Sequence, residues 1–214
     1  MYLPKPFEET RTDVLHALVR QRPFGALVVM TTDGLSVDHL PFVINATTGP
    51  LGVLHGHVSR ANPLCRATPA DTDAVAIFQG PHHYITPSWY PTKAETGKVV
   101  PTWNYVVVHA YGRPRFIDDQ AWLRQHLEQL TRQHEGARIA PWKPSDAPED
   151  YLSKLLGGIV GVELPIAQLS GKWKLGQNRS TVDRTGMVDG LLHETDDDAQ
   201  ALAALIQGAS ARST

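Results

Sequence analysis

The sequence predicts an α+β protein, mainly β, in which antiparallel strands form a small barrel that is flanked by helices. Two observations favour this fold class. Short runs rich in β-branched and aromatic residues follow one another closely between residues 24 and 117, with turn-forming pairs such as Asp33-Gly34 between them. Helical spacing of apolar residues is found mainly outside these runs, near both ends and after residue 118.

The first elements are a helix and three strands. Apolar residues at helical spacing predict a short amphipathic helix over residues 7–22, with Thr10 as its cap. The runs at 24–32, 35–44 and 52–58 are typical of strands, and the turn residues between them predict an antiparallel meander.

Two more strands are expected at residues 73–80 and 102–117, the second with a bend at Gly112. The segment between the meander and these strands, residues 59–68, is typical of a loop or a short helix. Residues 118–134 carry apolar side chains on one helical face, and Asp118 is placed to cap that helix.

The last third alternates between irregular and regular segments. A Pro-rich connector at 140–151 leads into a helix at 148–156, and the apolar run 157–166 predicts a strand that returns to the barrel. Residues 170–186 are too rich in turn formers and polar groups for a regular element. A final helix is expected at 196–207, with three acids at its positive end.

Composition restricts the function classes. The 214 residues are 42% hydrophobic and 20% charged, the balance of a soluble globular protein. A net charge of -2 gives no global electrostatic basis for nucleic-acid binding. The single cysteine, Cys65, excludes an intramolecular disulfide and a cysteine-rich metal site. No apolar run approaches the length of a membrane helix and no signal-peptide pattern is present, so we expect a cytoplasmic protein without membrane contact.

Three segments carry unusual polar chemistry. In the first, "HGHVSRANP", a strand runs into a loop where Ser59 and Arg60 could hold a phosphate through charge-assisted hydrogen bonds. The alternative is that Ser59 or Asn62 caps a helix while Arg60 is solvated. In the second, "FQGPHHYITPSWY" and "VPTWNYVVVHAYG", aromatic rings such as Trp103 could stack on a flat ligand whose polar edge Asn104 or Gln79 could satisfy. Core packing is the alternative there.

The third segment, "GKWKLGQNRSTVDR", gathers Lys172, Lys174, Arg179 and Arg184 around Trp173. This suits a planar anionic ligand or a subunit contact, and the alternative is a solvated basic loop.

The histidines are a separate question, because His55 and His57 would share one strand face. A metal site would need a third ligand, and no standard ligand spacing is present, so we expect no metal. Rossmann, P-loop and α/β-hydrolase motifs are also absent from the sequence.

Taken in order, these segments with "MYLPKPFEE", "RPFGALV", "DHLPFVI" and "IVGVELPI" resemble the PaiB family, described as FMN-binding negative transcriptional regulators. The resemblance spans Met1 to about Leu191. It implies a split β-barrel, a homodimer, and FMN at the subunit interface. It also implies an FMN-binding split-barrel domain over residues 1–192, with a helical insertion at about 118–157, and a C-terminal helix and tail over residues 193–214.

The wider split-barrel group, which includes the pyridoxamine phosphate oxidases, implies roles for particular residues. Its Ser-Arg-Lys phosphate grip resembles Ser59-Arg60, but Ala61 replaces the lysine and the first barrel strand lacks the usual basic residues. The reduced grip leaves open whether purified protein holds FMN. The expected cofactor-binding residues are His57, Ser59, Arg60, Asn62, Trp103, Asn104, Lys172, Trp173, Lys174, Gln177, Asn178 and Arg179.

The resemblance implies a transcriptional regulator or flavin-dependent sensor that acts as a homodimer, with DNA or another regulator as a partner that the net charge does not support. One alternative is a flavin-dependent oxidoreductase acting on a small or haem-like substrate. Another is an interaction module that has lost its cofactor. The sequence identifies no catalytic residue, and flavin chemistry does not require a general base from the protein.

Overall fold

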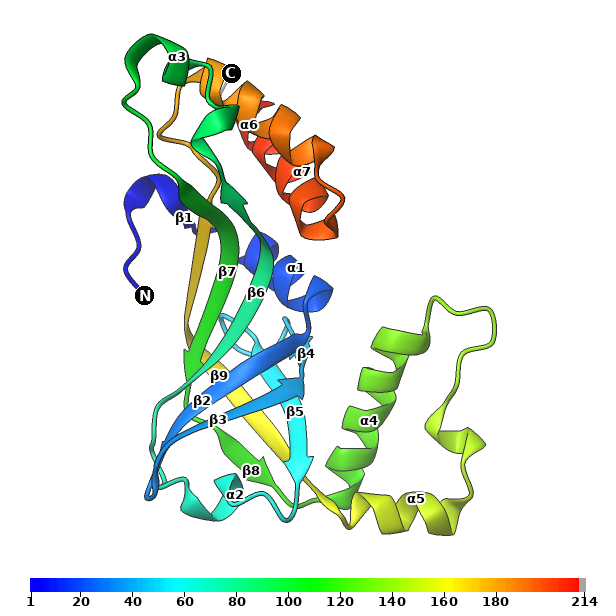
Figure 1. Ribbon diagram of the computed structural model, residues 1–214. Helices are drawn as coiled ribbons and strands as arrows, with labels where there is room; N and C mark the ends of the chain where they lie inside the picture. Colours follow the sequence, from blue (N-terminus) through cyan, green and yellow to red (C-terminus); the bar gives the residue numbers. More distant parts are fainter. Residues whose placement is uncertain (212–214) are drawn as a thin grey trace. The chain divides into compact units, whose positions relative to one another are not determined.

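The computed structural model describes residues 1–211 (Figure 1). Its strands are β1 Glu8–Glu9, β2 Phe24–Thr31, β3 Gly34–Pro41, β4 Val43–Asn45, β5 Val53–Ser59, β6 Ala74–Ile85, β7 Thr102–Gly112, β8 Arg115–Ile117 and β9 Ile159–Lys174. Its α-helices are α1 Thr12–Gln21, α2 Leu64–Ala67, α3 Thr92–Thr96, α4 Gln120–Glu135, α5 Glu149–Leu156, α6 Thr181–His193 and α7 Asp197–Ala211. Single 3₁₀ turns are η1 Lys5–Phe7, η2 Pro87–Trp89 and η3 Pro144–Asp146.

The strands form an open sheet in the order β3-β2-β6-β7-β9-β5-β4, and β1 and β8 each pair with β9. The pairs whose register is defined are antiparallel. This confirms the predicted α+β class with an antiparallel sheet. The chain divides into two compact units. Strands β6, β7 and β9 contribute residues to both units.

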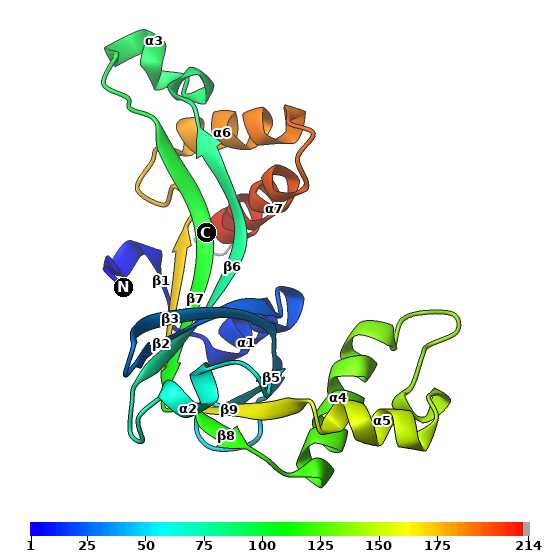
Figure 2. The ribbon, with the colours of Figure 1, turned by 60° about the horizontal axis from the view of Figure 1, so that its bottom comes forward.

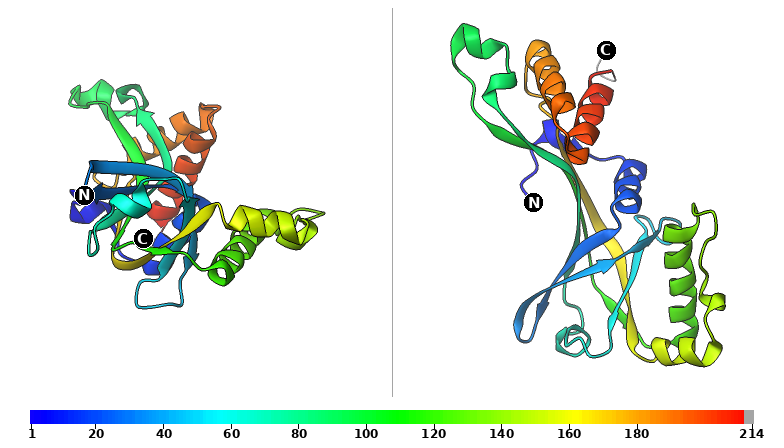
Figure 3. Two further views of the ribbon diagram at one scale, coloured as in Figure 1. Left: turned by 90° about the horizontal axis from the view of Figure 1, so that it is seen from below. Right: turned by 45° about the vertical axis from the view of Figure 1, so that its right-hand side comes forward.

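The first unit contains Met1–Thr10, Gln79–Val108 and the chain from Ser170 onward. Helices α6 and α7 lie side by side in it (Figure 3). Met187, Leu191 and Leu202 are fully buried and form its apolar interior with Ile85. Helix α6 begins at a capped end, because the Ser180 hydroxyl accepts a hydrogen bond from the backbone N–H of Asp183.

The second unit contains Arg11–Phe78 and His109–Leu169. Its barrel core is built around Phe42 and Phe78, whose rings meet edge to face at 5.5 Å between centroids. Helices α4 and α5 pack against each other beside the strands (Figure 2). Trp122 of α4 lies directly on Gly161 of β9, where a Cβ atom would stand 2.3 Å from the indole ring. Glycine is therefore required for this helix to approach the sheet.

Several predicted boundaries were wrong in the amino-terminal part. The first helix begins at Thr12 with Arg11, not Thr10, at the cap position. The predicted strand 35–44 divides at Phe42, which is buried, and the predicted meander is not formed. Instead β2 and β3 make a hairpin while β4 pairs with β5, so β3 and β4 lie at opposite ends of the strand order.

Two further predictions are corrected in the second half. Helix α4 is capped by Asp119, whose carboxylate accepts from the N–H of Trp122 at 2.7 Å, because Asp118 turns toward Arg60 instead. Residues 170–186 are largely regular, since β9 continues to Lys174 and α6 starts at Thr181. The pairing of Gly171 and Lys172 with β1 supplies the backbone partners that local composition did not reveal. The helix predicted at 196–207 is α7.

Candidate functional site

Three cationic side chains of the first unit form what we call the cation cluster: Lys172, Lys174 and Arg179. Lys172 is buried, donates to the carbonyl of Tyr2 at 3.1 Å, and lies 5.4 Å from the ring centroid of Tyr105. The Arg179 guanidinium lies 4.9 Å from the ring centroid of Tyr90. Both cations are thus placed over aromatic rings, which stabilise positive charge without neutralising it.

Lys174 is the half-buried lysine of the cation cluster. Its Nζ donates to the hydroxyl of Thr102 at 2.6 Å. Burial lowers the pKa of Lys174, and the nearby charges of Lys172 and Arg179 also lower it. Within residues 1–211 no carboxylate forms an ion pair with any of the three cations. The cation cluster therefore carries uncompensated positive charge, which favours an anionic ligand.

Asn104, in the same unit, has an unsatisfied polar atom. It is 1% exposed, its amide nitrogen donates to the Met187 sulfur at 3.3 Å, and its carbonyl oxygen has no partner in the described structure. Buried carbonyl groups are normally hydrogen-bonded. The oxygen is thus available to accept from a ligand N–H. Trp103, beside it in sequence, is exposed and stacks on His82 at 6.1 Å.

The other residues expected to bind the cofactor from the third segment differ in whether their side chains are available to a ligand. Gln177 is used by the chain itself, because its oxygen accepts from Leu175 N at 2.8 Å and its nitrogen donates to Trp173 O at 2.6 Å. It shapes the turn after β9. Trp173 is half-buried and Asn178 is exposed. The tryptophan therefore remains a candidate for ligand contact, while Gln177 has a structural role.

Ser59, Arg60 and Asn62 belong to the second unit. The two terminal nitrogens of Arg60 donate to the two oxygens of Asp118 at 2.7 and 2.6 Å, and its Nε donates to Gly157 O at 2.7 Å. This exposed pair raises the pKa of Arg60 and lowers that of Asp118, chiefly through their hydrogen bonds. The guanidinium that was expected to grip a phosphate is therefore already engaged by a carboxylate.

The neighbours of Arg60 are also satisfied locally. The Ser59 hydroxyl accepts from Ala61 N at 3.2 Å. Asn62 donates to Asp38 at 2.6 Å and accepts from Leu64 N at 2.9 Å at the start of α2. The contact of Asn62 with the start of α2 agrees with part of the alternative interpretation of the loop. Its other part, a solvated Arg60, is wrong because Arg60 pairs with Asp118.

His57 contacts a residue that the sequence reasoning missed. Its Nδ1 lies 3.1 Å from Nε2 of His126, which is 2% exposed on α4. His126 could have been found, because it lies on the apolar helical face with Trp122 and Leu127. No group of three or more His, Cys, Asp or Glu residues within 1–211 is arranged to hold a metal ion. His55 instead contacts Glu163 at 3.3 Å.

Asp183 is the other missed residue. It is buried in the first unit and accepts from both the N–H and the hydroxyl of Thr92, at 3.2 and 2.9 Å. Those bonds join α6 to the start of α3. The residue lies in the segment that was predicted to be irregular, so no local signal indicated its burial.

The first unit holds side chains of the kinds that an FMN site uses. A phosphate or a reduced flavin ring needs cations that are not already paired, and the cation cluster supplies them. The isoalloxazine ring needs aromatic or apolar faces and a polar group at its edge. Trp103 and Trp173 supply faces, and the free oxygen of Asn104 supplies an acceptor. The Arg60 set fits less well, because a phosphate there would have to displace Asp118.

Comparison with known protein families gives one match. The model of the family described as "Putative FMN-binding domain" matches residues 1–168. The chain is 30% identical over 207 residues to the protease synthase and sporulation protein PAI 2 of Bacillus subtilis, covering 97% of both chains. It is 33% identical over 242 residues to an uncharacterized protein of Emericella nidulans, covering 97% of this chain and 96% of that protein.

Solved structures show the same fold at low sequence identity. The FAD and heme binding protein from Mycobacterium smegmatis superposes with a TM-score of 0.58 at 18% identity, covering 83% of this chain and 78% of that one. The flavocytochrome from Azotobacter vinelandii gives a TM-score of 0.57 at 16% identity, covering 78% and 69%. None of the helices in the described part of the chain has the length and apolar character needed to span a bilayer.

Proposed function

Because the chain belongs to the PaiB family of FMN-binding domain proteins, we propose that it is a cytoplasmic homodimer that uses FMN as a sensor or transcriptional regulator. Membership in this family is the ground for a flavin cofactor in this protein. The observation that best supports a ligand in the first unit is the cation cluster, which lacks carboxylate partners in the described structure and lies in the same unit as the orphaned oxygen of Asn104.

Each group has a distinct part in this proposal. Lys172, Lys174 and Arg179 would hold the negative charge of the ligand, Trp103 and Trp173 would contact its ring, and Asn104 would accept from a ring N–H. Bound FMN would supply reversible electron transfer. The protein's own groups bind and orient, and none of them is placed as a general base.

The Ser59-Arg60-Asn62 loop forms the second candidate set for flavin contact. Support for it comes from the resemblance to the phosphate grip. The Asp118 carboxylate must leave Arg60 before a phosphate can be bound there. We propose the cation cluster as the principal anion-binding group. Comparing the FMN affinity of a Lys174 variant with that of an Arg60 variant distinguishes the two candidate sets.

The hairpin of β2 and β3 supports the homodimer. Phe24, Met30, Leu35 and Val37, which we call the apolar hairpin face, are each more than half exposed. Met30 lies opposite Leu35 in the register and Val28 lies opposite Val37, so strand alternation places these side chains on one side of the hairpin. A row of exposed apolar side chains on paired strands suits an isologous contact with a second copy.

Absorbance spectra of the purified protein, with and without added FMN, test the flavin proposal. We expect flavin bands near ~450 nm in the isolated protein or saturable binding of added FMN. Lack of both would reject the sensor and leave the interaction module that has lost its cofactor.

The regulatory role is tested by binding to the protein's own promoter DNA at several salt concentrations, where salt-insensitive or absent binding argues against direct DNA contact.

A flavin-dependent oxidoreductase is the second candidate, and Lys174 favours it. The Lys174 ammonium, with Thr102 as its hydrogen-bond partner, would stabilise the negative charge that a bound flavin ring gains on reduction. Anaerobic mixing of the FMN-loaded protein with NADH or NADPH tests this function. Bleaching of the flavin bands supports a reductase, and an unchanged spectrum with both donors counts against it.

A further inference from the structure

The helical part of the second unit contains a cavity of about 280 Å³, which we call the insertion cavity. Its walls are apolar and come from α4, α5 and the start of β9: Leu127, Leu152, Leu155 and Ile159. Trp142, from the connector between the helices, adds an aromatic wall. No residue of the cation cluster lines it, so the proposed flavin function does not account for it.

Two polar side chains, His57 and Thr131, line the insertion cavity. His57 lines the cavity, and its Nδ1 is 3.1 Å from Nε2 of His126. The described residues provide no hydrogen-bond partner for the other ring nitrogen of His57. A polar atom at the edge of an apolar pocket is what fixes the orientation of a small ligand.

The hydrogen-bond pattern indicates which atom carries the proton. Burial lowers the pKa of both histidines, so both rings are neutral at pH 7 and one of them donates to the other. Nδ1 of His126 is buried and has no partner in the described structure. Because a buried N–H without a partner is rarer than a buried acceptor without one, His126 donates from Nε2. His57 then carries its proton on Nε2, where it can donate to a ligand.

The position of the His57 ring is fixed by packing around its hydrogen-bond partner, His126. His126 stacks on Trp122 with ring centroids 5.4 Å apart, and Trp122 lies on Gly161. These contacts hold the His126 ring, which in turn holds the His57 ring through their hydrogen bond. A donor that is positioned before binding loses little entropy when the ligand arrives.

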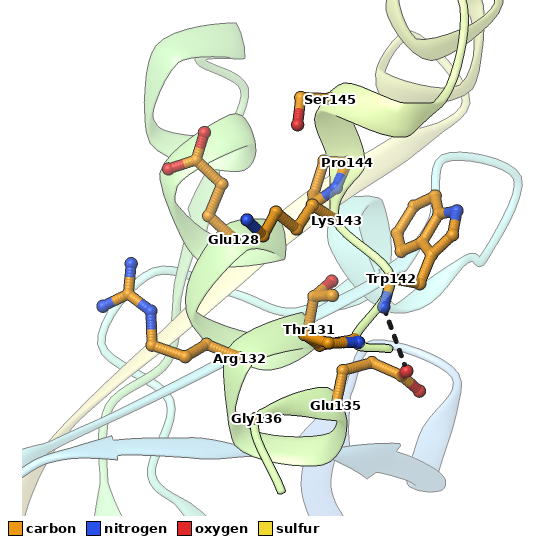
Figure 4. A pocket seen from close by; sticks show the side chains of 10 residues that line it. Glu128, Thr131, Arg132, Glu135, Gly136, Trp142, Lys143, Pro144 and Ser145 are labelled. Atoms are coloured by element: carbon orange, nitrogen blue, oxygen red, sulfur yellow. Dashed lines mark hydrogen bonds between the residues drawn. The ribbon is translucent and has the colours of Figure 1, made fainter. Parts of the chain in front are cut away.

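The cavity on the other side of the connector has different chemistry (Figure 4). It is also about 280 Å³ and shares Thr131, Trp142 and Pro144 with the insertion cavity, but Glu128, Arg132 and Lys143 line it. The Trp142 backbone N–H donates to Glu135 at 3.2 Å, which anchors the partition. Charged groups thus gather on one side of the connector, and the insertion cavity offers a neutral environment.

Cavity size limits the ligand. An apolar cavity of about 150 Å³ binds benzene, so the insertion cavity suits a planar molecule of roughly ten to twelve non-hydrogen atoms. We propose that the insertion cavity binds a small, neutral aromatic molecule with a carbonyl-type oxygen, which accepts a hydrogen bond from Nε2 of His57. This assigns His57 to the insertion cavity and not to the flavin.

The test uses 1-indanone as the carbonyl probe and indane as the matched hydrocarbon, with the full-length protein saturated with FMN. Methyl resonances of the leucines and isoleucines report binding by NMR titration. We expect saturable binding of 1-indanone, about fivefold to tenfold tighter than that of indane, because one neutral hydrogen bond distinguishes them.

Three variants locate the site. Leu155→Trp fills the cavity from a half-exposed position and should abolish binding of both probes, while Leu192→Trp, at a similarly exposed position on α6, should leave both unchanged. His57→Phe should retain indane binding and remove the preference for 1-indanone. Methyl spectra of each free variant verify its fold, and His57→Ala, which also removes the N–H donor, serves if His57→Phe does not fold.

Each outcome decides the proposal. No saturable binding to the wild-type protein, or binding that persists unchanged in Leu155→Trp, would overturn the site. An unchanged preference for 1-indanone in His57→Phe would overturn the role of His57. The titration is repeated without FMN, so failure of flavin binding is recognised separately from failure of the cavity.

Discussion

A substitution at Lys174 tests the proposed anion site at the scale of a single residue. The Lys174 ammonium group is held by Thr102 and lies near two other cations, with no acid paired to it in the described structure. We expect Lys174→Met to raise the Kd for FMN by about tenfold, the size of a lost charge-assisted contact. Fluorescence titration with FMN measures this change.

Two variants serve as controls for that measurement. Lys98→Met makes the same substitution at an exposed position of the same unit and should leave the Kd unchanged. Arg60→Ala should have a smaller effect than Lys174→Met, because Asp118 already occupies the guanidinium. A larger loss of affinity in Arg60→Ala would move the phosphate to the Ser59-Arg60 loop.

His126 makes stability depend on pH. Burial, followed by the charges of His57 and His55, lowers its pKa to about 3, whereas an unfolded histidine titrates near ~6.5. Between these values the unfolded chain binds the proton and the folded chain does not, so the free energy of unfolding decreases as pH falls. This residue alone should remove about 2 kcal/mol between pH 7.5 and 5.

Urea unfolding over a pH series checks this expectation. His126→Gln should flatten the acid side of the stability profile, although His55, His57 and His109, whose pKa values burial also lowers, keep part of the slope. His134→Gln is the matched control, because His134 is an exposed residue of the same helix. An unchanged slope in His126→Gln would show that the buried imidazole does not control the transition.

The sequence identified Lys172, Lys174, Arg179 and Asn104 as polar groups that a plain scaffold does not need. Within residues 1–211 the three cations have no carboxylate partner and the Asn104 oxygen has no hydrogen-bond partner. Their part in ligand binding stays a prediction. The sequence could not show that Asp118 engages Arg60, because that partner is 58 residues away in the chain. Pairing across such separations is set by the fold and not by local pattern.

Helix α4 offers a test at the scale of an element. Asp119 caps it through a 2.7 Å bond to Trp122 N, and the helix carries both His126 and Trp122. We expect Asp119→Ala to lower the free energy of unfolding by about 1 kcal/mol. Asp118→Ala, one residue earlier, should have a smaller effect because its ion pair is exposed. Urea denaturation measures both, and equal losses would contradict the assignment of the cap.

The sequence predicted some elements better than others. Helices α4, α5 and α7 were found because their apolar spacing and flanking residues are strong local signals. Residues 170–186 were assigned incorrectly, because Lys172 is held in a strand by pairing with Glu8. Helix α6 has Gly186 and Gly190 in its interior, and both lie against η2 where a Cβ would clash. Tertiary packing there overrides weak helix propensity.

At the scale of the whole molecule, fold class was predictable and strand order was not. Closely spaced, β-rich runs with turn residues predict an antiparallel sheet. They do not predict that β9 pairs with β5, β8 and β1 along its 16 residues. The resemblance to the PaiB family supplied the split-barrel expectation that composition and periodicity could not.

The oligomeric state is the last prediction, and it depends on the apolar hairpin face. Leu35 and Val37 project from β3 with more than half of each side chain exposed, although both residues are typical of protein interiors. Covering them with a second copy would remove apolar surface from water without disturbing the barrel interior. We therefore expect sedimentation velocity to show a dimer for the wild-type protein and a monomer for Leu35→Lys/Val37→Lys. The circular dichroism of the variant should remain native, because neither side chain is buried within one chain.

Leu192→Lys, which introduces the same charge at another exposed leucine, should remain dimeric. A dimer that survives the double substitution would place the subunit contact on a different surface.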